Sequence, residues 1–107
     1  MEHNYSDNND RKRYRILVVD DEQDLCEILR FNLEAEGYQV VTANSAEEAL
    51  LLDLGSFNLL LLDVMMGGMS GYTMASKLKQ MPVTANIPII FLTARDSEND
   101  MVTGFNI

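Results

Sequence analysis

Short apolar runs alternate along the chain with segments of mixed polarity, and this alternation predicts the order of strands and helices. The apolar runs occupy 14–19, 38–43, 58–62 and 87–92. A short apolar run between turn residues is typical of a strand that is buried on both faces, as in the middle of a parallel sheet. The intervening stretches place apolar residues at helical spacing and predict helices between Asp21 and Gly37, over 45–54, over 72–81 and from Glu98 toward Asn106.

Polar residues and glycines mark the ends of these helices. Asp21 is expected to cap the first helix, because acidic side chains suit the positive end of the helix dipole. Gly37 is expected to follow its last turn, and the pair Ser45 and Glu48 resembles a capping box at the start of the second helix. The buried face of the first helix is expected to carry Leu25, Ile28, Leu29, Asn32 and Leu33.

The regular alternation of strands and helices predicts an α/β fold with a doubly wound parallel sheet. Crossover connections of this kind are almost always right-handed. We expect the strand order 2-1-3-4, in which the chain changes direction across the sheet between its first and third strands. Ligands of open α/β sheets bind at such a switch point, beyond the carboxyl ends of the strands.

Composition and charge narrow the class of protein. The 107 residues suffice for one small domain, which we expect to span 14–107 after a disordered tail at 1–13. The net charge of -9 argues against nucleic-acid binding by this segment, since phosphate contacts require a basic surface. The single cysteine, Cys26, excludes an intramolecular disulfide, and we expect it to be a small buried hydrophobe. The chain shows neither a signal peptide nor a membrane span, so we expect it in the cytoplasm and away from membranes.

Three carboxylates follow two of the predicted strands. Asp20 and Asp21 come directly after the first strand, and Asp63 ends the leucine run at 58–62. At the switch point these like charges would repel one another, and a divalent cation would remove that repulsion. Oxygen ligands without His or Cys favour Mg²⁺, with Mn²⁺ or Ca²⁺ as substitutes. A carboxylate beside such a cation can attack phosphorus and form an acyl phosphate, and the hydroxyl of Thr93 follows the fourth strand on the same side.

The segments 16–22, 59–66 and 88–94 together resemble the receiver domain of two-component response regulators. The similarity covers about 14–107 and is greatest to the subfamily that carries a winged-helix DNA-binding domain. It implies the flavodoxin-like strand order and a signalling module rather than an enzyme. It also implies a sensor histidine kinase as the phosphoryl donor, docked by the first helix near Asp21, and DNA contact only through an effector domain outside this chain.

The resemblance assigns a role to individual residues of the site. Asp63 would be the phosphoacceptor, and Asp21 and Asp63 would bind Mg²⁺ directly. Asp20 would act through the water shell of the metal, and the backbone carbonyl of Met65 would be a further ligand. Thr93 would be the switch hydroxyl that turns toward the phosphoryl group.

The chain departs from the family pattern in two places. Gly67 and Gly68 stand where the family usually has a proline, so we expect a mobile loop. The sequence also stops before the fifth strand with its lysine and before the fifth helix, so we expect a C-terminally incomplete receiver. The fourth strand would then be an apolar edge beside an uncovered sheet face, which predicts self-association, for example by exchange of the terminal segment.

Three alternative functions are weighed against a working receiver. A phosphatase with an aspartate nucleophile needs a second Asp two residues later, where this chain has Met65. A nucleotide- or flavin-binding module would carry a glycine-rich phosphate loop after the first strand, and none is present. A folded fragment that cannot switch, acting only as an interaction or swapped-dimer module, is the alternative that stays open.

Overall fold

The computed structural model describes residues 11, 13–92 and, for the backbone alone, 102–104. The predicted tail at 1–13 lies largely outside the described residues and stays a prediction. The elements, in chain order, are β1 (Arg15–Val19), α2 (Gln23–Ala35), β2 (Gln39–Ala43), α3 (Ala46–Ala49), the 3-10 turn η1 (Leu54–Ser56), β3 (Leu59–Asp63), α4 (Gly71–Lys79), β4 (Ile89–Leu92) and β5 (Val102–Gly104). Among the described residues, no helix has the length and apolar character that crossing a bilayer requires.

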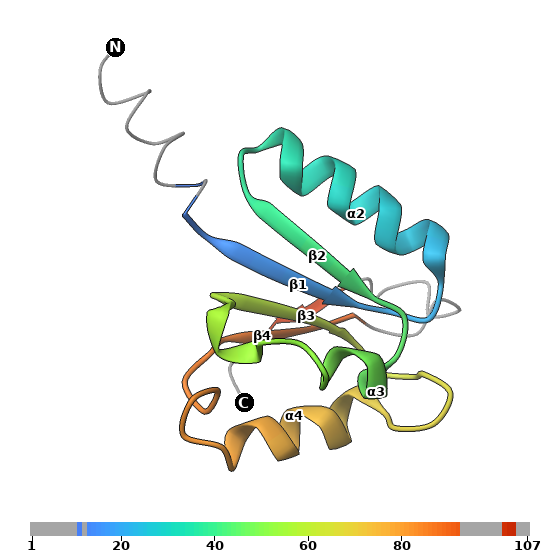
Figure 1. Ribbon diagram of the computed structural model, residues 1–107. Helices are drawn as coiled ribbons and strands as arrows, with labels where there is room; N and C mark the ends of the chain where they lie inside the picture. The colour runs from blue at the N-terminus through green and yellow to red at the C-terminus, as the bar shows by residue number, and fades with distance from the viewer. Residues whose placement is uncertain (1–10, 12, 93–101, 105–107) are drawn as a thin grey trace.

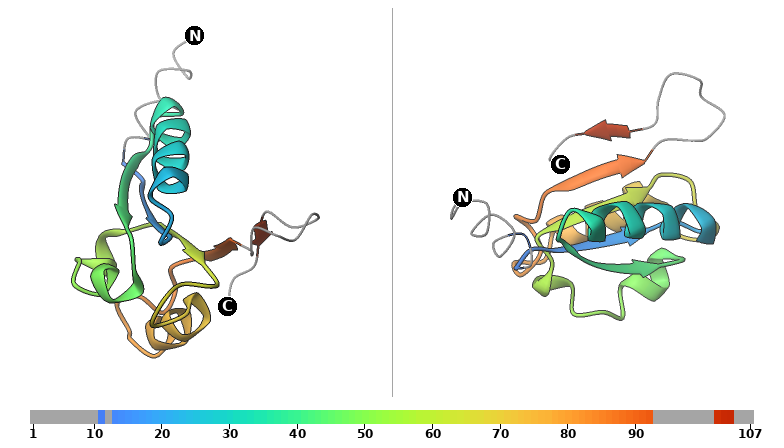
Figure 2. Two further views of the ribbon diagram at one scale, coloured as in Figure 1. Left: turned by 90° about the vertical axis from the view of Figure 1, so that its right-hand side faces the viewer. Right: turned by 90° about the horizontal axis from the view of Figure 1, so that it is seen from above.

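The strands form one sheet in the order β2-β1-β3-β4-β5 (Figures 1 and 2). β1 pairs in parallel with both β2 and β3, and β3 pairs in parallel with β4. This confirms the predicted doubly wound arrangement and the order 2-1-3-4. The chain reverses its direction of travel across the sheet between β1 and β3, so the switch point lies at the carboxyl ends of these two strands.

Helices cover the two faces of the sheet unequally. α2 lies on one face, and α3 and α4 lie on the other (Figures 1 and 2). The core beneath α3 and α4 is the larger and includes Leu17, Leu62, Met74 and Phe91. The core beneath α2 contains only four buried residues, namely Ile16, Val18, Cys26 and Leu61. A hollow of about 480 Å³, lined by residues such as Ile16, Leu33 and Leu59, opens beside α2, as expected of a face that one helix covers.

The first helix is rotated and shifted relative to the sequence-based prediction. Its N-cap is Glu22, without a capping side-chain hydrogen bond, so the assignment of Asp21 as the cap was wrong. Cys26 is the buried centre of the helix, and Ile28 is 56% exposed rather than buried. The physical reason is that the small thiol lets α2 pack closely on β1 and β2, which turns Ile28 and Phe31 to solvent. The end was predicted correctly: Gly37 has a positive φ of 104° after the last turn.

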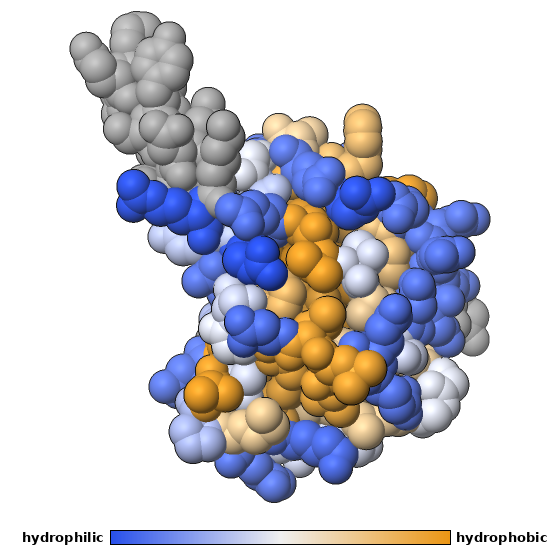
Figure 3. Space-filling model, viewed as in Figure 1, coloured by the Kyte–Doolittle hydropathy of each residue, from blue (hydrophilic) through white to orange (hydrophobic). Residues whose placement is uncertain are grey.

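The second helix is shorter than predicted, because α3 ends at Ala49 rather than near residue 54. Its last turn tightens, with the amides of Leu51 and Leu52 bonded to carbonyls three residues back. The chain then turns to bury Leu54 and Phe57, which leaves Leu51 86% exposed. Figure 3 shows apolar side chains gathered over the middle of the face that the edge strand β2 lines, with polar side chains on either side.

The C-terminal segment corrects two predictions. Val102–Gly104 is a strand, so the helix predicted from Glu98 toward Asn106 was wrong over these residues. This strand pairs antiparallel with β4, opposite Ile90, Phe91 and Leu92, so β4 is not the free edge that was expected. The reason is that the backbone groups of an apolar edge strand are unsatisfied until another segment bonds to them, and Val and Thr favour strands. Self-association of the chain stays a prediction.

Candidate functional site

The three carboxylates singled out in the sequence come together at the switch point. Val19 of β1 lies opposite Leu62 of β3, so the residues that follow each of them emerge at the same end of the sheet. Asp20 is 1% exposed and Asp63 is fully buried, whereas Asp21 is exposed. One oxygen of each carboxylate lies within 4.8 Å of one oxygen of the others. The strands thus place two buried and one exposed carboxylate in a single cluster.

Backbone amides orient the two buried carboxylates. Oδ1 of Asp20 accepts a hydrogen bond from the amide of Glu22 at 2.8 Å. Oδ1 of Asp63 accepts a longer one from the amide of Met65 at 3.3 Å. In both cases the donor lies two residues downstream, so each Asp closes a local turn as its strand ends. The turn fixes one oxygen of each side chain and aims the carboxylates at the same point.

The donor set of this cluster fits Mg²⁺. It consists of carboxylate oxygens only, without His or Cys, as hard divalent cations prefer. Two carboxylates about 4.8 Å apart at an effective dielectric of ~20 repel each other by about 3 kcal/mol. A divalent cation bound by Asp20, Asp21 and Asp63 would offset this repulsion.

Of the two other predicted site residues, Met65 is described by the structure and Thr93 is not. Met65 is exposed in the loop after β3, and its assignment as a backbone ligand stays a prediction. Thr93 lies outside the described residues, so its role as the switch hydroxyl also stays a prediction. The described part of β4 ends at Leu92, opposite Asp63, which puts the chain exit toward Thr93 at the carboxylate end of the sheet.

Gly71, which is not among the site residues predicted from the sequence, holds the loop against β3. Gly71, the first residue of α4, is buried, and its amide bonds to the carbonyl of Val64 at 3.0 Å. A Cβ on Gly71 would lie 2.2 Å from the carbonyl oxygen of Asp63, so only glycine permits this approach. The sequence carries one signal for this role of Gly71. Gly71 directly follows the capping residue Ser70, at a helix position where a better helix former than glycine would usually stand.

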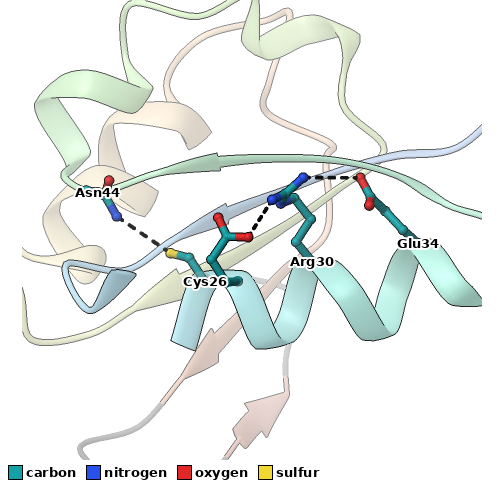
Figure 4. Close-up of polar contacts among 5 residues, drawn as sticks. Cys26, Arg30, Glu34 and Asn44 are labelled. Carbon is teal, nitrogen blue, oxygen red and sulfur yellow. Dashed lines mark hydrogen bonds and ion pairs between the residues drawn. The ribbon is translucent and has the colours of Figure 1, made fainter. Parts of the chain in front are cut away.

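Cys26 and Asn44 hydrogen-bond to the backbone of the turn that Asp20 and Asp21 form. The thiol of Cys26 donates to the carbonyl of Asp20 at 3.3 Å, and the amide of Asn44 donates to the same oxygen at 3.2 Å. Figure 4 shows Cys26 and Asn44 reaching toward each other from α2 and from the end of β2. Farther along α2, Arg30 lies between Glu27 and Glu34, on the exposed side. These hydrogen bonds were not predictable from the sequence, because they depend on contact between β1, α2 and β2.

The Cys26 thiol is expected to resist alkylation in the folded protein. Burial, reinforced by the charge of Asp20, raises its pKa to about 11, and the thiolate is the reactive form. Iodoacetamide at pH 8 should therefore leave the folded protein almost unmodified and modify the urea-unfolded protein quickly, as measured by intact mass. A raised thiol pKa also means that the unfolded chain loses its proton first, so the free energy of unfolding should fall as pH rises from about 9 to about 11. Fast alkylation of the folded protein would contradict the buried placement.

Comparison with known proteins gives a consistent answer. The response regulator receiver domain family matches residues 16–107. The phosphate regulon transcriptional regulatory protein PhoB of Rhizobium meliloti (strain 1021) is 45% identical over 91 residues, which cover 84% of this chain and 40% of PhoB. The alkaline phosphatase synthesis transcriptional regulatory protein PhoP of Bacillus subtilis (strain 168) is 40% identical over 94 residues, which cover 87% of this chain and 38% of PhoP. The chain thus spans about two fifths of the length of these relatives.

Solved structures agree with these sequence relatives. The response regulator TrrA from Thermotoga maritima, solved in complex with Mg(2+)-BeF, superimposes with a TM-score of 0.70 at 39% identity, over 80% of this chain and 74% of that one. The N-terminal domain of a response regulator receiver protein from Methanoculleus marisnigri JR1 gives a TM-score of 0.72 at 41% identity, over 77% of this chain and 68% of that one. The fold, the carboxylate cluster at the switch point and these matches together show that the chain belongs to the response regulator receiver domain family.

Proposed function

We propose that this chain is a phosphoacceptor that takes a phosphoryl group onto Asp63. The observation that carries the proposal is the cluster of Asp20, Asp21 and Asp63, with oxygens within 4.8 Å of one another. Asp63 is the cluster member that ends the central strand β3 and is followed by a loop rather than by a helix. Its position at the carboxyl end of the sheet, where ligands of open α/β sheets bind, supports Asp63 as the acceptor.

In the proposed reaction, a carboxylate oxygen of Asp63 attacks the phosphorus of the donor. The new oxygen–phosphorus bond forms as the bond from phosphorus to the leaving group breaks, and the leaving group departs with the bonding electron pair. Asp20 and Asp21, with Asp63 itself and the Met65 carbonyl, would hold Mg²⁺, which when bound neutralises negative charge on the phosphoryl oxygens. The amide of Met65 holds one oxygen of Asp63 and so orients the other. The hydroxyl of Thr93 would donate to the transferred group.

A sensor histidine kinase is the proposed donor, as for receiver domains in general, and α2 offers it a surface. Ile28 is 56% exposed and Phe31 is 74% exposed on this helix, which starts directly after the Asp20–Asp21 turn. Exposed apolar residues on the helix that begins next to the carboxylate cluster suit a partner that must bring its phosphohistidine to Asp63. Output to DNA would run through an effector domain, as the names of the relatives as transcriptional regulators suggest.

A folded module that does not switch is the second candidate. The observation that favours it is the antiparallel pairing of Val102–Gly104 with β4, because this pairing takes up the edge to which a further parallel strand would bond. Such a chain would keep the fold and the carboxylates without taking up phosphate or changing state.

The experiment that tests the proposal is intact-mass measurement after incubation with acetyl phosphate, a small donor that needs no kinase. We expect the mass of one phosphoryl group to be added when Mg²⁺ is present and none when EDTA replaces it. The reason is that the carboxylate cluster needs its charge offset before an anionic donor can approach. Circular dichroism of the same sample checks that the chain is folded. A folded sample without the added mass would contradict the phosphoacceptor proposal and support the second candidate.

A further inference from the structure

We infer that Glu47, a residue of α3 outside the carboxylate cluster, positions the loop that follows the acceptor. The inference rests on the proposed function, because it concerns the same site, but its structural basis is a separate contact. Oε2 of Glu47 accepts a hydrogen bond from the backbone amide of Met69 at 3.1 Å. Through this bond α3 holds the segment that connects β3 to α4.

The contact matters because two glycines interrupt the loop between Met66, which is buried in the core, and Met69, which packs against that core. The loop is fixed at its start by the bond from the Met65 amide to Asp63, and at its end by the bond from Gly71 to Val64. Between these points lie Gly67, which has no neighbouring atoms where a Cβ would stand, and Gly68. Two consecutive glycines lose more conformational entropy on ordering than any other pair, so an additional bond is required to keep one geometry.

Gly68 lies directly beside the carboxylate of Glu47. Its φ of +79° lies in the left-handed region that glycine adopts without strain. A Cβ at this position would stand 3.0 Å from Oε2 of Glu47, the same oxygen that binds the Met69 amide. The absence of a side chain at 68 therefore leaves the space in which the carboxylate reaches the loop.

The other end of the contact is rigid. Glu47 stands in the first turn of α3, between the buried residues Ala46 and Ala49. The hydroxyl of Ser45 caps this turn by accepting from the amide of Glu48 at 2.9 Å. Glu47 itself is exposed, but the buried alanines fix the backbone from which it extends. Its carboxylate therefore holds the loop at a fixed place, and with the loop the Met65 carbonyl that is proposed to bind Mg²⁺.

The test compares Glu47→Ala with Glu47→Gln in Mg²⁺ binding measured by isothermal titration calorimetry, without a phosphodonor. Glu47→Ala removes the acceptor for the Met69 amide, and we expect the Kd for Mg²⁺ to rise about three- to tenfold, the range of one typical intramolecular hydrogen bond at an exposed position. Glu47→Gln keeps an oxygen that can accept the same bond and removes the charge, so we expect its Kd to stay within about twofold of that of the unchanged protein. With acetyl phosphate, the labelling rate of Glu47→Ala should be restored at saturating Mg²⁺.

Hydrogen exchange of the Met69 amide, followed by NMR, gives a second and independent measurement. The amide should exchange faster in Glu47→Ala than in Glu47→Gln, with circular dichroism unchanged in both. Equal Mg²⁺ affinity and equal Met69 exchange in Glu47→Ala and the unchanged protein would overturn the inference. So would equal weakening by both variants, which would mean that only the charge of Glu47 acts. If the unchanged protein binds Mg²⁺ but accepts no phosphoryl group, the proposed function fails while the calorimetry and the exchange still decide the role of Glu47.

Discussion

Asp63→Asn is expected to abolish phosphorylation of the chain by acetyl phosphate while preserving its fold. The amide of Asn is not a nucleophile toward phosphorus, and Asp63 is the carboxylate of the cluster that a loop rather than a helix follows. Asn has nearly the same shape as Asp, so the packing of this fully buried side chain should be unchanged. Intact mass after incubation with acetyl phosphate and Mg²⁺ is the measurement, with the unchanged chain as the positive control.

The thermal stability of the same variant provides a further check. Removing one of two buried like charges, which repel by about 3 kcal/mol at ~20 effective dielectric, should keep or raise the Tm without Mg²⁺. Saturating Mg²⁺ at about 100 times its Kd should raise the stability of the unchanged protein by about 2.7 kcal/mol, and that of Asp63→Asn by much less. Continued labelling of the variant would place the acceptor elsewhere, and an undiminished Mg²⁺ effect would remove Asp63 from the cation site.

Gly71→Ala is expected to be among the most destabilising single-methyl substitutions in this chain. The new Cβ would lie 2.2 Å from the carbonyl oxygen of Asp63 and 2.9 Å from its carbonyl carbon, and both are backbone atoms of a central strand. Because neither partner can rotate away, we expect a loss of about 3 kcal/mol of unfolding free energy, the upper end for overpacking. For a domain of this size, that loss lowers the Tm by roughly 10–20 °C in a thermal melt followed by circular dichroism.

Gly67→Ala, in the same loop, is the matched control for this prediction. A Cβ on Gly67 would meet nothing within 4 Å, and its φ is not in the left-handed region. We therefore expect an unchanged or slightly higher Tm, since alanine restricts the unfolded chain more than glycine does. Equal Tm values for the two alanine variants would show that α4 does not approach the acceptor strand as closely as described.

Features set by strand order were predictable from the sequence. A run of leucines ending in Asp63 and a second apolar run ending in Asp20 require both carboxylates at strand ends, because a charge inside a buried strand is too costly. The alternation of strands with helices then requires parallel neighbours, which brings both ends to one edge of the sheet. The cluster follows from these two constraints without knowledge of any side-chain conformation.

Features that depend on contacts between elements were not predictable. Asp21 and Glu22 are both acceptable at the start of a helix, and only the turn closed by Asp20 decides that Glu22 is the cap. The bond between Glu47 and Met69 joins residues whose sequence patterns indicate only a solvent-exposed helix turn and a loop. The strand at Val102–Gly104 forms because β4 offers it a partner, which local propensity for a helix cannot report.

The order of strands in the sheet also determines when the proposed cation site can form during folding. Asp20 follows β1 and Asp63 ends β3, and α2, β2, α3 and η1 lie between them in the sequence. A nascent chain that has formed only β1, α2 and β2 therefore has an acidic turn but no chelating site. At the proposed site, Mg²⁺ would bind strongly only after β3 has inserted beside β1, so the ion would select the completed topology rather than guide its early steps. In kinetic terms, Mg²⁺ should slow unfolding more than it speeds folding.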